Sequence, residues 1–204
     1  AATPNIDKLA AAGLNFTQAR NQSTVCMPAR STILTGQSIR RHGVTSNGIP
    51  LPDDAPSLSH HMKSKGYKTA LLGKAHLEPH AGTTFFENLA ANEGNIGPHR
   101  GFDRMELAGH SGRIARSTFH YPKWLNEHHA NEVKGFHEYA VQGTPSARPG
   151  GDTDAPQVAH NPIPKELYHT HWTAERTKAW LDTLDDADDW FCWMSFPDPH
   201  HPWD

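Results

Sequence analysis

The sequence predicts an α/β protein, in which helices alternate with short buried strands. Two runs have the composition of such strands, residues 67–72 and 190–196, and the second is almost entirely apolar, as expected for a strand buried on both faces. Each run follows a stretch with helical spacing of apolar residues, at 58–65 and at 164–185. The loop after each run carries basic side chains, and ligands of open α/β sheets bind beyond the carboxyl ends of strands.

The chain opens with a predicted helix over residues 3–13, because Thr3 can cap it and Pro4 suits its first turn. Residues 14–19 are expected to form a short strand. A polar loop then leads to Cys26.

A second helix is predicted to begin near Cys26, because Pro28 fits a first turn, where its missing N–H costs no hydrogen bond. The helix is expected to end near Gly36 and to turn three apolar residues toward the core: Met27, Ile33 and Leu34. The thiol then lies at a helix N-terminus, which stabilises negative charge. The alternative for a lone cysteine is a buried structural role.

Residues 37–48 are predicted to form a polar loop, in which Arg40, Arg41 and His42 either line an anion site or lie on a solvated surface. Further along, Ser57 is expected to open the helix at 58–65 and Gly66 to end it.

The strand at residues 67–72 ends in a motif that suits an anion, Gly73-Lys74-Ala75-His76. A lysine and a histidine so close together at the carboxyl end of a strand can both reach one bound anion.

Residues 78–164 are rich in glycine, proline, histidine and asparagine and have poor periodicity, so they are predicted to be a loop-rich insertion that shapes a substrate pocket. Residues 121–128 are the exception, with weak helical character, while 111–118 and 143–154 are expected to be loops. The following side chains either form a pocket wall or pack locally: Tyr121, Trp124, His128 and His129.

The helix at 164–185 is the best defined, with an apolar stripe of Trp172, Ala179, Trp180 and Leu184. Cys192 in the strand that follows is expected to be a core residue. The loop after this strand contains three prolines that fix its path, and it presents His200 or His201 at the edge of the sheet.

Composition excludes several classes of function. The formal net charge is −3, which implies neither a nucleic-acid partner nor a membrane surface, and no apolar run approaches the roughly 18 residues of a membrane span. The two cysteines, Cys26 and Cys192, give no disulfide framework.

A set of short motifs resembles the type I sulfatases, in the alkaline-phosphatase-like superfamily. The most specific motif is Cys-x-Pro-x-Arg-x-x-x-x-Thr-Gly over residues 26–36. Further stretches match in the same order, namely residues 3–9, 66–70, 73–77, 101–103 and 198–203. The resemblance implies a central mixed, mostly parallel sheet flanked by helices, with residues 1–204 forming part of the catalytic domain.

The resemblance also implies a mechanism. Cys26 is converted to formylglycine by a formylglycine-generating enzyme, and the hydrated aldehyde attacks the sulfur of a sulfate ester or sulfamate. Matching positions give Arg30, Lys74, His76 and His200 as catalytic residues and Lys74, His200 and His201 as substrate contacts. Ala75 departs from the family, which often has tryptophan there, and this leaves the substrate open.

The family uses a divalent metal, for which calcium is expected and magnesium or manganese are alternatives. Residue 26 as formylglycine is one implied ligand, and the carboxylate ligands are expected outside this chain, so the 204 residues alone are expected to be inactive. The implied substrate is a small-molecule or saccharide sulfate ester. The alternatives are a phosphonate monoester or phosphodiester hydrolase of the same superfamily, and an inactive fragment that acts as a binding module.

Overall fold

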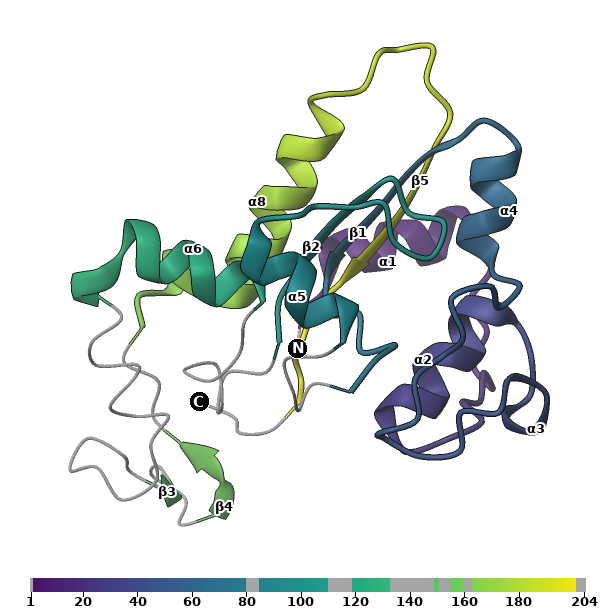
Figure 1. Cartoon of the computed structure of the whole chain (residues 1–204), viewed down its shortest axis with the longest axis horizontal. Coiled ribbons are helices and arrows are strands. Elements are labelled where there is room, and N and C mark those ends of the chain that lie inside the picture. The colour runs from purple at the N-terminus through teal and green to yellow at the C-terminus, as the bar shows by residue number, and fades with distance from the viewer. Residues whose placement is uncertain are drawn as a thin grey trace.

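The computed structural model describes residues 2–79, 85–109, 119–132 and 163–200, and the backbone alone at 149–150 and 155–159. Its main sheet has three parallel strands in the order β2-β1-β5. These strands are β1 (Lys68–Gly73), β2 (Arg104–Leu107) and β5 (Trp190–Ser195). An antiparallel pair, β3 (Pro149–Gly150) and β4 (Ala155–Ala159), lies apart from this sheet (Figure 1). The predicted α/β class is therefore confirmed.

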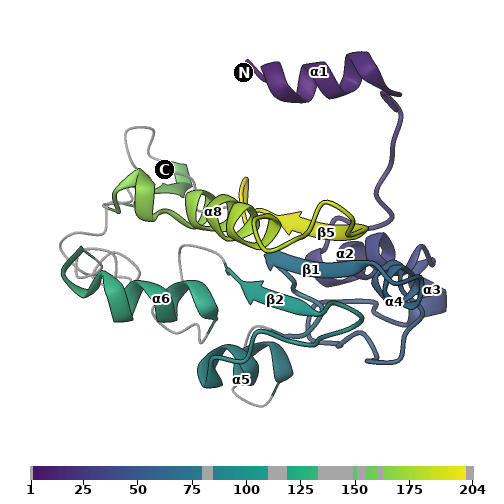
Figure 2. The ribbon, with the colours of Figure 1, turned by 90° about the horizontal axis from the view of Figure 1, so that it is seen from above.

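Helices cover both faces of the sheet, with α8 on one face and α5 on the other (Figures 1 and 2). The helices are α1 (Pro4–Ala12), α2 (Cys26–Thr35), α3 (Ile39–His42), α4 (Leu58–Ser64), α5 (Phe86–Glu93), α6 (His120–His128), a 3-10 turn η2 (Lys165–Leu167) and α8 (His169–Leu181). Within the described residues no helix combines the length and the apolar character that crossing a membrane requires.

The central strand β1 divides the core because its side chains alternate between the two faces of the sheet. Leu71 belongs to the larger cluster, which includes Met27 and Leu34 of α2. Ala70 and Leu72 point the other way and pack with Trp180 of α8, against which Cys192 is half-buried. Cys192 is therefore a packing residue, and burial raises the pKa of its thiol to about 11.

Several local predictions are confirmed by cap geometry. Gly36 follows α2 with φ of 66°, and its N–H donates to the carbonyl of Thr32. The Ser57 hydroxyl accepts from the His60 N–H at the start of α4. Two details differ, because Ile33 is 61 % exposed rather than buried and residues 37–48 contain the short helix α3.

The predicted strand at 14–19 is wrong, since these residues form a turn with no ladder partner. Leu14 and Phe16 are 85 % and 75 % exposed, and all residues of α1 are likewise exposed or nearly so. Figure 2 shows α1 standing apart from the sheet and the other helices. A strand needs a neighbouring strand for its backbone hydrogen bonds, and the described residues offer none here.

Residues 78–164 are not uniformly loop-like, which corrects the sequence reading. They contain α5 and the central-sheet strand β2, neither of which was predicted, as well as the predicted helix α6. β2 has the sequence Arg-Met-Glu-Leu, which has little strand propensity of its own. β2 is therefore a strand because it pairs with β1. Residues 111–118 and most of 143–154 lie outside the described residues.

The last strand is less buried than its composition predicts. β5 lies at an edge of the described sheet, and Trp190 and Met194 are 50 % and 45 % exposed. The predicted helix before it is shorter than 164–185, since α8 ends at Leu181. Trp172 and Trp180 are both 4 % exposed, so the core-facing part of the apolar stripe is confirmed.

Candidate active site

Cys26 is the first residue of α2, as the proline pattern predicts. The next residue fixes this start, because the Met27 N–H donates to Asn47 Oδ1 at 2.9 Å and the Met27 side chain is fully buried. The Sγ of Cys26 lies 4.0 Å from the Nζ of Lys74. The thiol therefore has a helix N-terminus beneath it and a cation beside it, and both favour negative charge.

Lys74 and His76 lie directly after β1, at the carboxyl end of the central strand. The Lys74 N–H donates to the Ser195 carbonyl of β5 at 2.7 Å, which holds the loop against the neighbouring strand. Lys74 and His76 are 5 % and 7 % exposed. His76 has φ of 55°, a left-handed conformation that is uncommon for a residue with a side chain and often occurs at functional positions.

Arg30 of α2 holds the helix, β1 and β5 together. Its guanidinium donates to the carbonyls of Lys74 and Ala75 and, at 2.5 Å, to the Ser195 hydroxyl. It also lies over the Trp193 ring, 4.9 Å from the centroid. Most of its donors thus hold the loop that carries Lys74. The catalytic role that the resemblance implies for Arg30 stays a prediction.

The site is strongly electropositive because its basic groups share a buried space. Burial lowers the pKa of Arg30 to about 10 and of Lys74 to about 8, although the nearby Cys26 opposes both shifts. Burial and then the charges of Lys74, Arg30 and His200 lower the pKa of His76 to about 3. At neutral pH Arg30 and Lys74 are therefore charged, and His76 is a neutral imidazole.

His200 lies in the loop after β5, near enough to His76 to contribute to the lowered pKa of that imidazole. The loop is anchored by Asp198, which accepts from Tyr168 Oη at 3.2 Å and from Thr170 Oγ1 at 2.5 Å, at the start of α8. His201 lies outside the described residues, so its predicted substrate contact is not placed by the structure.

A buried ionic cluster behind the site was missed by sequence reasoning. Glu87 of α5 accepts from the Leu77 N–H at 3.1 Å, directly after His76, and its charge raises the pKa of Arg30. Arg100 bridges Glu78 at 3.1 Å, and Glu78 accepts from the Glu87 N–H at 2.8 Å. These carboxylates hold the backbone of the loop and offset part of its positive charge. The spacing of these residues in the sequence does not indicate the cluster, because α5 itself was not predicted.

The basic residues Arg40, Arg41 and His42, which the sequence offers as an anion site or a solvated surface, are partly explained by packing. His42 is buried, with Nδ1 accepting from the Val44 N–H at 3.1 Å and Nε2 3.0 Å from the Thr32 hydroxyl, so its role is structural. Arg40 and Arg41 are exposed.

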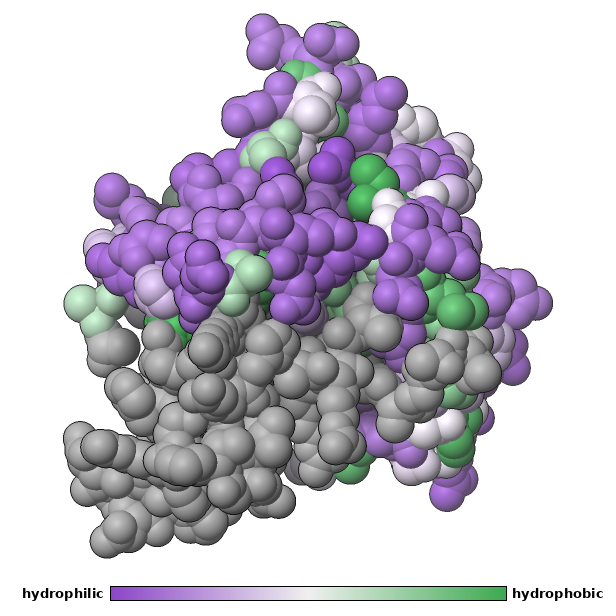
Figure 3. Space-filling view, turned by 60° about the vertical axis from the view of Figure 1, so that its left-hand side comes forward, coloured by the Kyte–Doolittle hydropathy of each residue, from purple (hydrophilic) through white to green (hydrophobic). Residues whose placement is uncertain are grey.

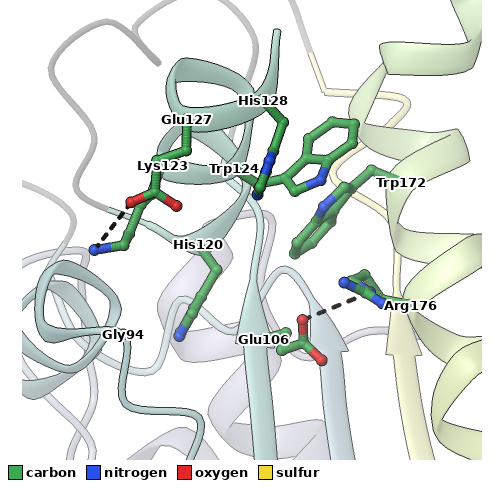
Figure 4. A pocket seen from close by; sticks show the side chains of 9 residues that line it. All are labelled: Gly94, Glu106, His120, Lys123, Trp124, Glu127, His128, Trp172 and Arg176. Atoms are coloured by element: carbon green, nitrogen blue, oxygen red, sulfur yellow. Dashed lines mark ion pairs between the residues drawn. The ribbon is translucent and has the colours of Figure 1, made fainter.

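Of the side chains considered for a pocket wall, Trp124 and His128 line a hollow beside α8 (Figure 4), and a role in binding substrate stays a prediction. Tyr121 is fully buried and donates from its hydroxyl to the Leu167 carbonyl at 2.8 Å. His129 packs on Trp124, with ring centroids 4.7 Å apart.

The site therefore places a cysteine at a helix N-terminus beside a lysine from the carboxyl end of a parallel strand, an arrangement that suits an anionic ligand. The sulfatase family model matches residues 1–204, and the chain belongs to the sulfatase family. An arylsulfatase of Clostridium perfringens is 28 % identical over 204 residues, which are 99 % of this chain and 39 % of that protein. A multifunctional alkaline phosphatase superfamily protein, PehA, of Trinickia caryophylli is 27 % identical over 223 residues, covering 98 % of this chain and 36 % of that protein.

Solved structures show the same fold. The phosphonate monoester hydrolase of Agrobacterium radiobacter superposes on 98 % of this chain with a TM-score of 0.64 and 23 % identity, and this covers 36 % of that protein. Ps i-CgsB in complex with k-i-k-neocarrahexaose superposes on 97 % of this chain with a TM-score of 0.56 and 21 % identity, over 40 % of its own length. The chain thus spans about two-fifths of the length of these relatives.

Proposed function

We propose that the protein containing this chain hydrolyses sulfate esters or sulfamates, with formylglycine made from Cys26 as the nucleophile. The observation that supports this most directly is the Cys26 thiol at the start of α2, 4.0 Å from Lys74 Nζ. When formed, formylglycine supplies a hydrated aldehyde, whose second hydroxyl lets sulfate leave without a stable covalent ester.

The substrate is an anion, so fixed cations are needed to hold it. Lys74 is suited to bind a sulfate oxygen as a point charge in this partly desolvated site. Neutral His76 can accept a hydrogen bond from a hydroxyl on residue 26, and a bound sulfate raises the pKa of the imidazole by supplying negative charge. His200 is suited to give a proton to the leaving alcohol as the S–O bond breaks.

The predicted divalent metal does not fit the described residues alone. Among them, no group of three or more histidine, cysteine or acidic side chains could hold a metal ion, and the site brings together cations rather than carboxylates. A calcium or magnesium ion requires about six oxygen ligands, several of them charged. The ligands of a divalent metal therefore stay a prediction for residues beyond these.

The maturation of Cys26 has a direct test. In protein purified from its native host, the peptide with Cys26 is expected to be lighter by about 18 Da, because the thiol is replaced by a carbonyl oxygen. Peptide mass spectrometry measures this, with the Cys192 peptide as the unmodified control. Finding Cys26 only as a thiol would contradict the formylglycine mechanism.

The anion site can be tested without turnover. Lys74→Ala is expected to weaken sulfate binding by about 1.5–3 kcal/mol, the range for a hydrogen bond to a charged group. Titration calorimetry at neutral pH measures the change, and the exposed Arg40→Ala is the control. If Arg40→Ala weakens binding and Lys74→Ala does not, the anion binds on the surface loop instead.

A second candidate function is phosphonate monoester or phosphodiester hydrolysis. It is favoured by the fold shared with the phosphonate monoester hydrolase and by the similarity to PehA. Assay of the full-length protein on matched aryl sulfate and aryl phosphonate monoesters distinguishes the two. A chain that turns over neither ester, even when matured, would support the third candidate, a binding module.

A further inference from the structure

The loop that carries His200 is attached to the N-terminal end of α8 through Asp198. Figure 1 shows α8 and β5 running in opposite directions, so the helix starts at the end of the sheet where this loop leaves the strand. Within the loop, the His200 N–H donates to the Pro197 carbonyl at 3.3 Å. This hydrogen bond closes a tight turn, which carries the Asp198 carboxylate and the His200 imidazole on one short segment.

Both carboxylate oxygens of Asp198 accept hydrogen bonds from α8 and its first flanking residue. Tyr168 Oη donates to Oδ1 at 3.2 Å, and Thr170 Oγ1 donates to Oδ2 at 2.5 Å. His169 Nε2 lies 3.7 Å from Oδ1, and burial lowers the pKa of this imidazole to about 4, although Asp198 opposes the shift. His169 is therefore neutral at neutral pH, and the two hydroxyl groups hold the carboxylate. We call Tyr168, Thr170 and Asp198 the loop clamp.

These contacts fit a positioning role for Asp198 rather than a role in acid–base chemistry. A general acid or base must reach the substrate, whereas each oxygen of this carboxylate already accepts from a hydroxyl of the protein. Hydrogen bonds to a charged group are stronger than those between neutral groups, and the positive end of α8 adds to them. The carboxylate therefore fixes the loop on the helix.

α8 is a rigid base for the loop clamp because its inner face is fixed in the core. Trp172 is 4 % exposed, and the fully buried Thr173 packs against Gly73, which directly precedes Lys74. Figure 3, which brings the side of α6 and α8 forward, shows a mostly hydrophilic described surface, so the helix is held from its inner side. The first two turns of α8 thus contact both loops that carry the predicted catalytic residues.

The position of His200 matters most when the leaving group is poor. As the S–O bond of a sulfate ester breaks, its electron pair stays on the ester oxygen, which takes a proton from protonated His200. The imidazole is left neutral and regains its proton from water. A proton donor must lie within hydrogen-bond reach of the oxygen it protonates. A strongly basic oxygen needs this proton, whereas a nitrophenolate is stable without it.

We propose that the loop clamp positions His200 for proton transfer and thereby determines how well esters with poor leaving groups are hydrolysed. The inference rests on the proposed function, because it concerns the bond that breaks in that reaction. Thr170 acts through Asp198 and the loop, so it is a positioning residue.

The experiment measures kcat/KM of the matured full-length protein on para-substituted phenyl sulfates, from 4-nitrophenyl to 4-methoxyphenyl. Thr170→Val replaces the hydroxyl by a methyl group. It is expected to lower kcat/KM about tenfold for 4-methoxyphenyl sulfate and less than about twofold for 4-nitrophenyl sulfate, because the lost hydrogen bond to a charged group matters only where a proton is needed. General damage to the fold would lower both values alike.

Three further variants make the test specific. Thr170→Ser keeps the hydroxyl and is expected to restore the values of the parent protein. Tyr168→Phe removes the other hydroxyl of the loop clamp and should act in the same direction as Thr170→Val, so it serves as a second test if that variant does not fold. Thr177→Val is the control, because it makes the same change two turns further along α8, where the hydroxyl donates to the Thr173 carbonyl at 2.8 Å. Circular dichroism of each variant confirms folding.

The outcomes separate this inference from the proposed function. A loss confined to poor leaving groups, absent from Thr170→Ser and Thr177→Val, would support the loop clamp. An equal loss on every ester, or no loss on any, would overturn it and leave the proposed function in place. Absence of turnover in the matured parent protein would contradict the proposed function and overturn this inference with it.

Discussion

Cys26→Ala in the full-length protein is expected to lower kcat for an aryl sulfate by at least about 10³-fold, or about 4 kcal/mol of transition-state stabilisation. The substitution removes the atom on which the nucleophile is built and leaves the cations in place. Cys26 is partly exposed at the start of α2, so alanine, a good helix former, leaves the fold intact. Sulfate binding at Lys74 is therefore expected to be retained while turnover is lost.

Cys26→Ser tests the same step from the other side. A serine hydroxyl can attack sulfur but has no second hydroxyl on the same carbon to expel the sulfate. The expected product is a protein heavier by about 80 Da, the mass of the transferred SO₃ group, after a single turnover. Cys192→Ala is the control, because that thiol packs beside Trp180. Unchanged multiple turnover by Cys26→Ala would show that residue 26 is not the nucleophile.

The local features of the site could be predicted because they depend on short-range rules. Proline in the first turn and glycine after the last turn define α2, and the position of Cys26 follows from them. The strand before Lys74 was also predicted to within a residue at each end. The link between α2, which carries Cys26, and the loop of Lys74 could not be derived from the spacing of residues. Arg30 makes this link by donating to carbonyls and to Ser195, 165 positions away in the chain.

The missed elements depend on tertiary pairing instead. β2 is a strand because Met105 and Glu106 lie beside Leu71 and Leu72 of β1, and its own residues do not favour that state. The predicted strand at 14–19 failed for the opposite reason, because its apolar residues stay exposed and it pairs with no strand among the described residues. The apolar composition of β5 also predicted more burial than the structure shows, because β5 lies at the edge of the described sheet.

Gly73 explains how two strands approach closely enough to bring Lys74 and Ser195 together. It has φ of 100°, and a Cβ at this position would lie 2.0 Å from the Ser195 carbonyl oxygen. The same carbonyl accepts from the Lys74 N–H at 2.7 Å. The cationic loop is thus attached to β5 at a point where only glycine fits.

Gly73→Ala is expected to lower the free energy of unfolding by about 3–5 kcal/mol. This loss is the sum of two costs: a left-handed backbone at a residue that has a side chain, and overlap of the new Cβ with a buried carbonyl. Urea denaturation of the variant and the parent protein measures the difference. Gly43→Ala is the matched control, because Gly43 also has a positive φ, 77°, but no atom lies within 4 Å of its added Cβ. It should lose only about 1 kcal/mol, the backbone part alone. Equal losses in the two variants would show that β1 and β5 do not approach this closely at Gly73.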